Sequence, residues 1–207
     1  MSNIAIQGAA TGTGVFTLAS PATNTNRTLT LPDEAGTVLT TAGVPASAMP
    51  AGSVLQVVQT VKTDTFSTTS ASYVDITGLS VSITPTSSSN KILVMFNGMI
   101  GNSDSTSSST IVQLVRGSTP ICIGDASGSR TQASSAMWTS SGTEQRRIVG
   151  QMNNTFLDSP STTSSTTYKL QIKAGGATAY VNRGGYDDDE NRVPLTASTI
   201  TVMEIAG

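Results

Sequence analysis

The sequence is a series of short apolar stretches in which large side chains alternate with small polar ones, separated by turn residues. The segment Leu79–Thr84 alternates between aliphatic and hydroxyl side chains, and Tyr168–Lys173 alternates between apolar and long polar ones. A period of two is that of a β-strand with one buried face and one wet face. Because no convincing helix lies between the strands, we predict an all-β protein, a sandwich or jelly roll without βαβ units.

One strand candidate, Ile92–Phe96, is apolar at every position. In an antiparallel protein this predicts cover on both faces, with a neighbouring subunit as one candidate for the cover. Gly175 and Gly176 predict a tight hairpin whose return strand is Ala177–Asn182. The other strand candidates are Ser53–Lys62, Leu79–Ile83, Thr110–Arg116, Thr119–Ile123, Arg147–Asn153, Thr167–Lys173 and Ser198–Ile205.

Two parts are visible along the chain. Residues 1–51 are rich in Gly and Pro and have too few apolar side chains to offset the entropy of ordering, so this segment is either disordered or wrapped around partner chains. We interpret it as an attachment and stem segment. Residues 52–207 are predicted to form an antiparallel β-sandwich head of the jelly-roll type. Short strand candidates within the stem are Val15–Leu18, Arg27–Leu31 and Thr37–Thr41.

Charge and hydropathy exclude several classes of partner. The net charge is −2 and the 11 Lys and Arg residues are scattered, Arg146-Arg147 being the one adjacent pair, so no nucleic-acid binding is expected. The longest apolar run is far too short to span a bilayer, and Met1–Ile4 does not begin a signal peptide. The single cysteine, Cys122, cannot form an intrachain disulfide and is expected to be a buried apolar side chain.

The sequence offers little catalytic chemistry. With no His, the usual Ser-His and Cys-His pairs cannot form, and a zinc site is implausible, so we predict no catalytic, cofactor-binding or metal-binding residues and no enzyme. Glycoside hydrolysis needs only two carboxylates, which leaves a polysaccharide hydrolase as an alternative. The Ser-x-x-Lys pattern at Ser88–Lys91 lacks its companion motifs and is a chance match in a Ser-rich chain.

Exposed loops are the candidate contact surfaces, namely Ser103–Ser109, Ala126–Ser141 and Tyr186–Arg192. The acidic run within the last loop is interpreted as solvated, with a Ca²⁺ site or a receptor contact as the alternative. The single Trp either covers one end of the head or stacks on a sugar ring of a host polysaccharide. The candidate receptor-contact residues are Trp138, Tyr186, Asp187, Asp188, Asp189 and Glu190.

Several segments resemble proteins of bacteriophage virions. Asn26–Thr41 resembles a module that recurs in tail-fibre and virion-appendage proteins, commonly just before a fibre tip. Phe156–Pro160, Thr167–Ile172 and Ser198–Ile205 resemble the tip domains of such fibres in marine and freshwater phages. The resemblance implies homotrimers with an intertwined β-rich stem and a jelly-roll-like head, in which the head often contacts the host surface and the N-terminal segment attaches to the virion.

Together these features predict a non-enzymatic virion structural protein, assembled in the host cytoplasm. It would be a homotrimeric tail fibre or appendage on the tail or capsid surface, bound to other virion proteins through residues 1–51. Its head, residues 52–207, would contact a host surface glycan or protein through several weak sites acting together. Capsid or baseplate decoration without a receptor role is the second interpretation, and a polysaccharide hydrolase is the third.

Overall fold

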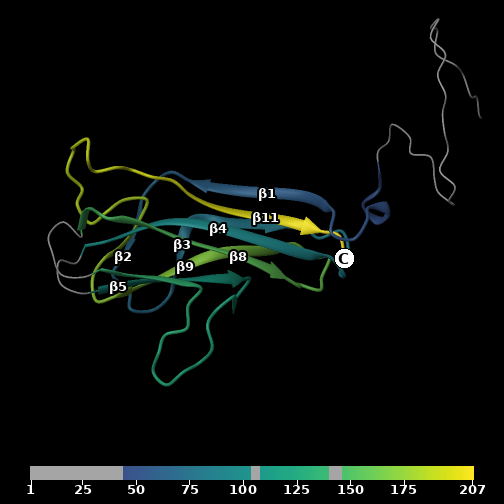
Figure 1. Ribbon diagram of the computed structural model, residues 1–207, viewed down its shortest axis with the longest axis horizontal. Helices are drawn as coiled ribbons and strands as arrows, with labels where there is room; N and C mark the ends of the chain where they lie inside the picture. Colours follow the sequence, from purple (N-terminus) through teal and green to yellow (C-terminus); the bar gives the residue numbers. More distant parts are fainter. Residues whose placement is uncertain (1–43, 104–107, 140–145) are drawn as a thin grey trace, which may run out of the picture. The chain divides into compact units, whose positions relative to one another are not determined.

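The computed structural model describes residues 44–103, 108–139 and 146–207 (Figure 1). The chain divides into two units, Met1–Leu39 and Thr40–Gly207, and every described residue belongs to the second. The stem strands predicted between residues 15 and 41, the module-like segment Asn26–Thr41 and the middle of the predicted loop Ser103–Ser109 lie outside the described residues.

The described chain forms two antiparallel sheets packed as a sandwich, which confirms the predicted fold class. Helical structure among these residues is limited to short 3-10 segments, η1 (Ala46–Ala48) and the one that includes Arg146 and Arg147. The first sheet has the order β1 (Val54–Lys62), β11 (Ser198–Ile205), β4 (Lys91–Asn102), β10 (Ala179–Val181) and β2 (Phe66–Thr68), with β8 (Val149–Asp158) also paired to β4. The second sheet has the order β3 (Val74–Ile83), β9 (Thr166–Gly175), β5 (Ser108–Arg116) and β6 (Thr119–Ile121), with β7 (Ser135–Thr139) also paired to β5.

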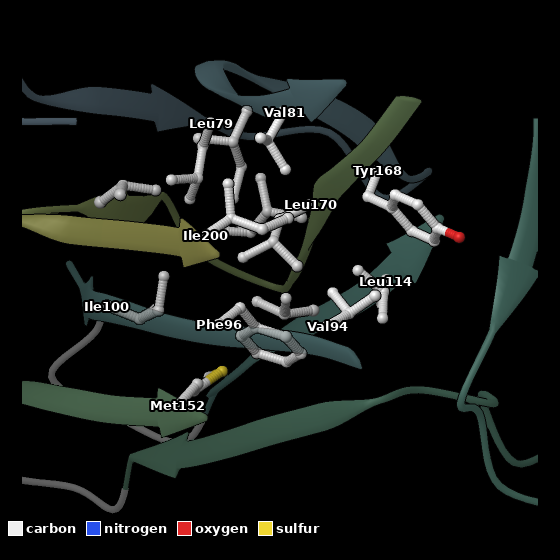
Figure 2. Packing of buried hydrophobic residues seen from close by; sticks show 14 of the residues in the cluster. Leu79, Val81, Val94, Phe96, Ile100, Leu114, Met152, Tyr168, Leu170 and Ile200 are labelled. Carbon is white, nitrogen blue, oxygen red and sulfur yellow. The ribbon is translucent and has the colours of Figure 1, made fainter. Parts of the chain in front are cut away.

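The core lies between the two sheets and is built from the alternating positions of both (Figure 2). Tyr168, Leu170 and Ile172 of β9 are fully buried, while the Lys and Gln residues between them face outward. In β3 the aliphatic members of the predicted alternation are buried and the Ser members are exposed. Each sheet buries the apolar side chains of one face. This burial stabilises the fold by about 25 cal/mol for each Å² of apolar surface removed from water, and it is the main stabilising contribution.

The predicted hairpin at Gly175-Gly176 is wrong. The strand that follows, β10 (Ala179–Val181), pairs with β4 and β2 in the first sheet and not with β9, its predecessor in the chain. Gly176 has a φ of 119°, which L side chains rarely adopt, and it lies where the chain leaves the second sheet. Two glycines mark a sharp change of direction, but they do not fix which sheet the chain joins next.

Two further predictions need correction. Ser135–Thr139, expected as loop, is strand β7, which pairs with β5 over its whole length. The all-apolar stretch Ile92–Phe96 contributes Ile92, Val94 and Phe96 to the core, but the side chains between them point outward and are only half-buried. The described chain therefore covers one face of this stretch and leaves the other open to solvent.

Cys122 is half-buried instead of buried, and lies just past the end of β6. Its φ of 52° places it in the left-handed region, which is uncommon for a residue with a side chain. Partial burial raises the pKa of the Cys122 thiol, so the thiol is protonated at neutral pH.

A buried carboxylate ties the last strand to the rest of the first sheet. Glu204 of β11 has no exposed surface and accepts hydrogen bonds from Gln56 Nε2 at 2.6 Å, Asn90 Nδ2 at 2.6 Å, Thr86 N at 2.6 Å and Thr86 Oγ1 at 2.8 Å. Burial favours the neutral form and raises the pKa, but these donors favour the charged form and outweigh it, so the pKa of Glu204 lies below its ordinary value of 4.5.

This lowered pKa predicts acid sensitivity. Because the folded pKa of Glu204 is below the unfolded one, its contribution to stability is complete above pH 4.5 and disappears as the pH falls through the folded pKa. We expect the melting temperature to decline as the pH is lowered below about 4.5, and to decline less in Glu204→Gln, which has no charge to lose. Thermal melts of both proteins between pH 3 and pH 7 measure this, and equal declines would contradict it.

Candidate contact surface

The two ends of the sandwich differ in what they carry. At one end, which we call the entry end, the chain arrives from its N-terminal part and the C-terminus is anchored (Figure 1). Gly52 N donates to Ala206 O at 2.8 Å, Ala206 N donates to Ser53 O at 2.9 Å, and Val54 lies opposite Ile205 in the sheet. Any segment that precedes the head therefore leaves it at this end.

The opposite end, which we call the contact end, carries parts of the loops predicted as contact surfaces. β4 finishes there at Asn102, β5 starts there at Ser108, and β7 reaches it at Thr139, opposite Ser108. β8 begins there too, because its first residue, Val149, lies opposite Gly101 near the end of β4. The long loop after β10 returns to the same end, since Gly185 N donates to Arg146 O at 2.6 Å, just before β8 begins.

Arginine and tyrosine side chains stack at the contact end. We call Arg146, Arg147, Tyr180, Arg183 and Tyr186 the Arg-Tyr cluster. The guanidinium carbon of Arg147 lies 4.5 Å from the centre of the Tyr186 ring, and that of Arg146 lies 6.0 Å from it. Arg183 lies 4.0 Å from the centre of the Tyr180 ring. These distances are those of cation-π contacts, which hold long side chains in fixed positions near the surface.

Glycines allow the loop after β10 to approach the rest of the contact end. A Cβ on Gly184 would lie 2.6 Å from Arg146 O, and one on Gly185 would lie 2.6 Å from the Cα of Ser103. Two backbone donors, Gly185 N at 2.6 Å and Tyr186 N at 3.2 Å, bond to Arg146 O. Only residues without a side chain permit this backbone-to-backbone contact, which places the Tyr186 ring beside Arg147.

The acidic run Asp187–Glu190 is exposed along its whole length, as the interpretation of a solvated loop predicts. Arg183 forms an ion pair with Asp187 at 3.4 Å, and Arg192 forms one with Glu190 at 2.6 Å. The hydrogen bond from Arg192 lowers the pKa of the Glu190 carboxyl. Among the described residues no group of three or more His, Cys, Asp or Glu is placed to hold a metal ion. The run and its neighbours line a shallow pocket of about 240 Å³, formed by Asp187, Asp188, Asp189, Glu190, Val193 and Leu195.

Trp138 lies on β7 and is 69% exposed. Its strand position is opposite Ser109 of β5, one residue from the contact end of the sheet. The ring therefore adds little to the core of this chain, which contradicts the interpretation that it packs over one end of the head. Trp138 and the Arg-Tyr cluster lie at the same end of the sandwich.

The sequence singled out Trp138, Tyr186 and the acidic run as candidates, and Arg183 and Arg192 as charges that flank this run. It did not predict the stacking of arginine on tyrosine. Arg146-Arg147 stands out as the one adjacent pair of basic residues, and Arg183 as a neighbour of two glycines. Neither signal shows that the two segments meet, because they are separated by more than 30 residues and three strands. The predicted loop Ala126–Ser141 also differs from expectation, since its first part lies against the second sheet, where Gln132 O accepts a hydrogen bond from Tyr73 Oη at 2.7 Å.

No protein-family model matches the chain, and no curated protein matches it. A structure of infectious bursal disease virus, Gx strain, aligns with a TM-score of 0.31 and 16% identity over 74% of this chain and 43% of that chain. The crystal structure of the infectious bursal disease virus VP2 subviral particle aligns with a TM-score of 0.30 and 16% identity over 73% of this chain and 37% of that chain. The chain thus spans less than half the length of either, and likeness at this level carries no argument about function. Among the described residues no helix is long and apolar enough to cross a membrane.

Proposed function

We propose that this chain is a structural protein of a bacteriophage virion, a homotrimeric tail fibre or appendage whose head contacts the host surface. Residues 1–51 attach it to other virion proteins, and the contact end of the head faces outward. The proposal assigns no catalytic step and no cofactor to the chain. It combines the resemblance of four segments to phage fibre proteins with the arrangement of the head.

The observation that carries the proposal is the opposition of the two ends. The chain enters the sandwich beside the C-terminus (Figure 1). By contrast, Trp138, the Arg-Tyr cluster and the acidic run lie at the far end. A protein tethered to a particle through its N-terminal segment would present this far end to the surroundings. That is the geometry needed by a tip that touches another surface.

The chemistry of the contact end suits a carbohydrate surface. An exposed Trp ring can stack on the apolar face of a sugar, while carboxylates and guanidinium groups hydrogen-bond to its hydroxyls. The arginines are held by ring contacts and ion pairs, so little side-chain entropy is lost on binding. One such shallow site binds weakly, and three on one rigid trimer multiply modest affinities by a large factor.

Substitutions at the contact end test this role. We expect Trp138→Ala and Tyr186→Ala each to weaken binding of the full chain to host cells or to an array of bacterial surface polysaccharides by about 10-fold or more, because an aromatic contact contributes about 1–3 kcal/mol at a binding hot spot. Binding of fluorescently labelled protein, titrated against cells or array spots, measures the change.

Thr163→Ala is the matched control. Thr163 is exposed in the loop between β8 and β9, at the entry end, and its truncation is expected to leave binding unchanged. Equal binding by all three variants and the unaltered chain would contradict a receptor role for the contact end. Release of reducing sugar from the polysaccharide during the assay would instead favour a hydrolase.

The position of the protein in the particle separates the fibre from the decoration interpretation. Immunogold labelling of phage particles that carry this chain is expected to mark the tips of tail fibres or appendages. Label spread over the capsid shell or baseplate would favour a cementing role without receptor contact. Particles without label would contradict both forms of the proposal.

A further inference from the structure

We infer that the outer face of the first sheet, over strands β1, β11, β4 and β8, is the surface through which copies of this chain contact one another. This inference names the contact surface for the trimer and so rests on the proposed function for its context. Its evidence is separate from that of the contact end, because it comes from strand register, exposure and charge on one face of the sandwich.

Strand register aligns four apolar side chains in one unbroken row across this face. Val57 of β1 lies opposite Met203 of β11, Met203 lies opposite Leu93 of β4, and Leu93 lies opposite Leu157 of β8. Val57 and Leu157, at the two ends of the row, are 55% and 53% exposed. Since directly opposed residues in antiparallel strands share a face, the row forms one apolar strip on the outside of the sheet.

The adjoining row is polar, but part of its hydrogen-bonding capacity is already used. It consists of Gln59, Thr201, Met95 and Thr155. Gln59 Nε2 donates to Thr201 Oγ1 at 2.7 Å, so this pair keeps its hydrogen bond when water is excluded. Covering such a row costs less than covering unpaired polar groups.

Charge is nearly absent from this face. Of the outward-facing positions on these four strands, all within the described part of the chain, Lys91 at the entry end is the one that carries charge. Where this face surrounds a threefold axis, residues near the axis meet their own copies, so a charge there would lie beside like charges. An uncharged face avoids this repulsion, which makes it suited to a second copy, whereas it offers nothing to a partner recognised by charge.

The second sheet provides an internal comparison. Its outward positions on β3 and β9 include Asp75, Lys169 and Lys173, and Lys169 forms an ion pair with Asp75 at 2.8 Å. The loop after β6 lies against this sheet, with Thr131 Oγ1 3.4 Å from Lys173 Nζ. One face of the sandwich is therefore charged and partly covered by its own chain, and the other carries one charge among its described residues, Lys91, and has exposed apolar side chains at Val57 and Leu157.

The open face is large enough to supply most of a contact between copies. Four strands about 4.8 Å apart, each at least the 8 residues of β11 long at about 3.4 Å per residue, cover about 500 Å². A stable interface buries about 800 Å² on each partner. The face supplies most of that area, and we expect the association of copies to depend on concentration when it acts alone.

The test is the mass of the full chain after charges are placed on this face. We expect Val57→Glu combined with Leu157→Glu to weaken self-association on the order of 100-fold, because copies would meet through buried like charges. Both sites are more than half exposed, so folding should be retained. Sedimentation velocity over a range of concentrations measures the change, and circular dichroism checks the fold. If the Glu variant unfolds, Val57→Ser with Leu157→Ser replaces it.

Thr77→Glu combined with Ser80→Glu is the matched control, since it adds the same two charges at exposed positions of β3 on the other sheet. A wild-type mass for the control and a reduced mass for the Val57 and Leu157 variant would support the inference. Wild-type masses for both would overturn it and leave a trimer built through another surface.

Two further outcomes would also overturn the inference. One is a full chain that is monomeric at every concentration. The other is protection of a monomeric Leu157→Cys variant, made in a Cys122→Ser background, from labelling by a maleimide. Such protection would mean that a segment of the same chain covers the face. If the unaltered chain forms the oligomer but does not bind host cells or polysaccharide, that result would contradict the proposed function alone.

Discussion

Glu204→Ala is expected to destabilise the head by about 3–5 kcal/mol. The carboxylate is fully buried and accepts hydrogen bonds from Gln56, Asn90 and Thr86. Its removal would leave several buried donors without an acceptor, and each unsatisfied donor costs about 1–3 kcal/mol. These donors come from β1 and from the segment between β3 and β4, so the loss would loosen the entry end, where both termini of the head are anchored.

Urea unfolding of the variant and the unaltered chain measures this difference. Glu190→Gln is the control, because Glu190 is an exposed carboxylate and its neutralisation should change stability by less than about 0.5 kcal/mol. Glu204→Gln keeps the shape and one acceptor oxygen and should fall between the two. A Glu204→Ala protein as stable as the Glu190→Gln protein would show that the buried network adds nothing to stability.

Gly101→Ala is expected to displace the loop that holds the Arg-Tyr cluster and to destabilise the head by about 3 kcal/mol. A Cβ at Gly101 would overlap the carbonyl oxygen of Arg183 and lie 2.8 Å from the Cα of Gly184. Both atoms belong to the backbone, so no side-chain rotation can relieve the overlap. We expect lower stability together with loss of the host binding measured for the contact end.

Gly98→Ala is a close control on the same strand. A Cβ at Gly98 would have its nearest neighbours at 3.6 Å, an ordinary van der Waals distance. Thermal melts and binding titrations should therefore separate the two alanine variants, with Gly98→Ala close to the unaltered chain in both. Matching results for Gly98→Ala and Gly101→Ala would contradict the close approach of the two segments.

The fold class could be predicted from the sequence because the period-two pattern of apolar and polar residues is visible within single strands. The alternation from Tyr168 to Ile172 is local, and both the strand and its buried face follow from it. Strand β7 was not predicted because Ser135–Thr139 contains no β-branched aliphatic residue. Its strand conformation depends on pairing with β5, which is not its neighbour in the sequence. The crossing after Gly176 is likewise decided by the partner strands of β10, far away in the sequence.

The sequence singles out candidate contact residues but does not show how the fold brings them together. Trp138 and the acidic run attract attention as a lone large ring and a dense cluster of charge. Their placement at one end depends on the register of β4, β5, β7 and β8, and the Arg-Tyr cluster depends on glycines that let two backbones touch. Such contacts link distant segments, and no local pattern encodes them.

The open face of the first sheet could likewise be predicted only in part from the local sequence. The prediction that Ile92–Phe96 is covered on both faces is correct for one face within the chain. On the other face, Leu93 and Met95 are half-buried. A continuous apolar strand indicates that both of its faces are shielded from water. It does not indicate whether the same chain or another copy shields them.

The most direct test of the account is the mass of the full 207-residue chain in solution, measured by size-exclusion chromatography with multi-angle light scattering. We expect a species of about three times the 21.2 kDa of one chain, which dissociates when charges are placed at Val57 and Leu157. A single species of 21.2 kDa at every concentration would contradict it.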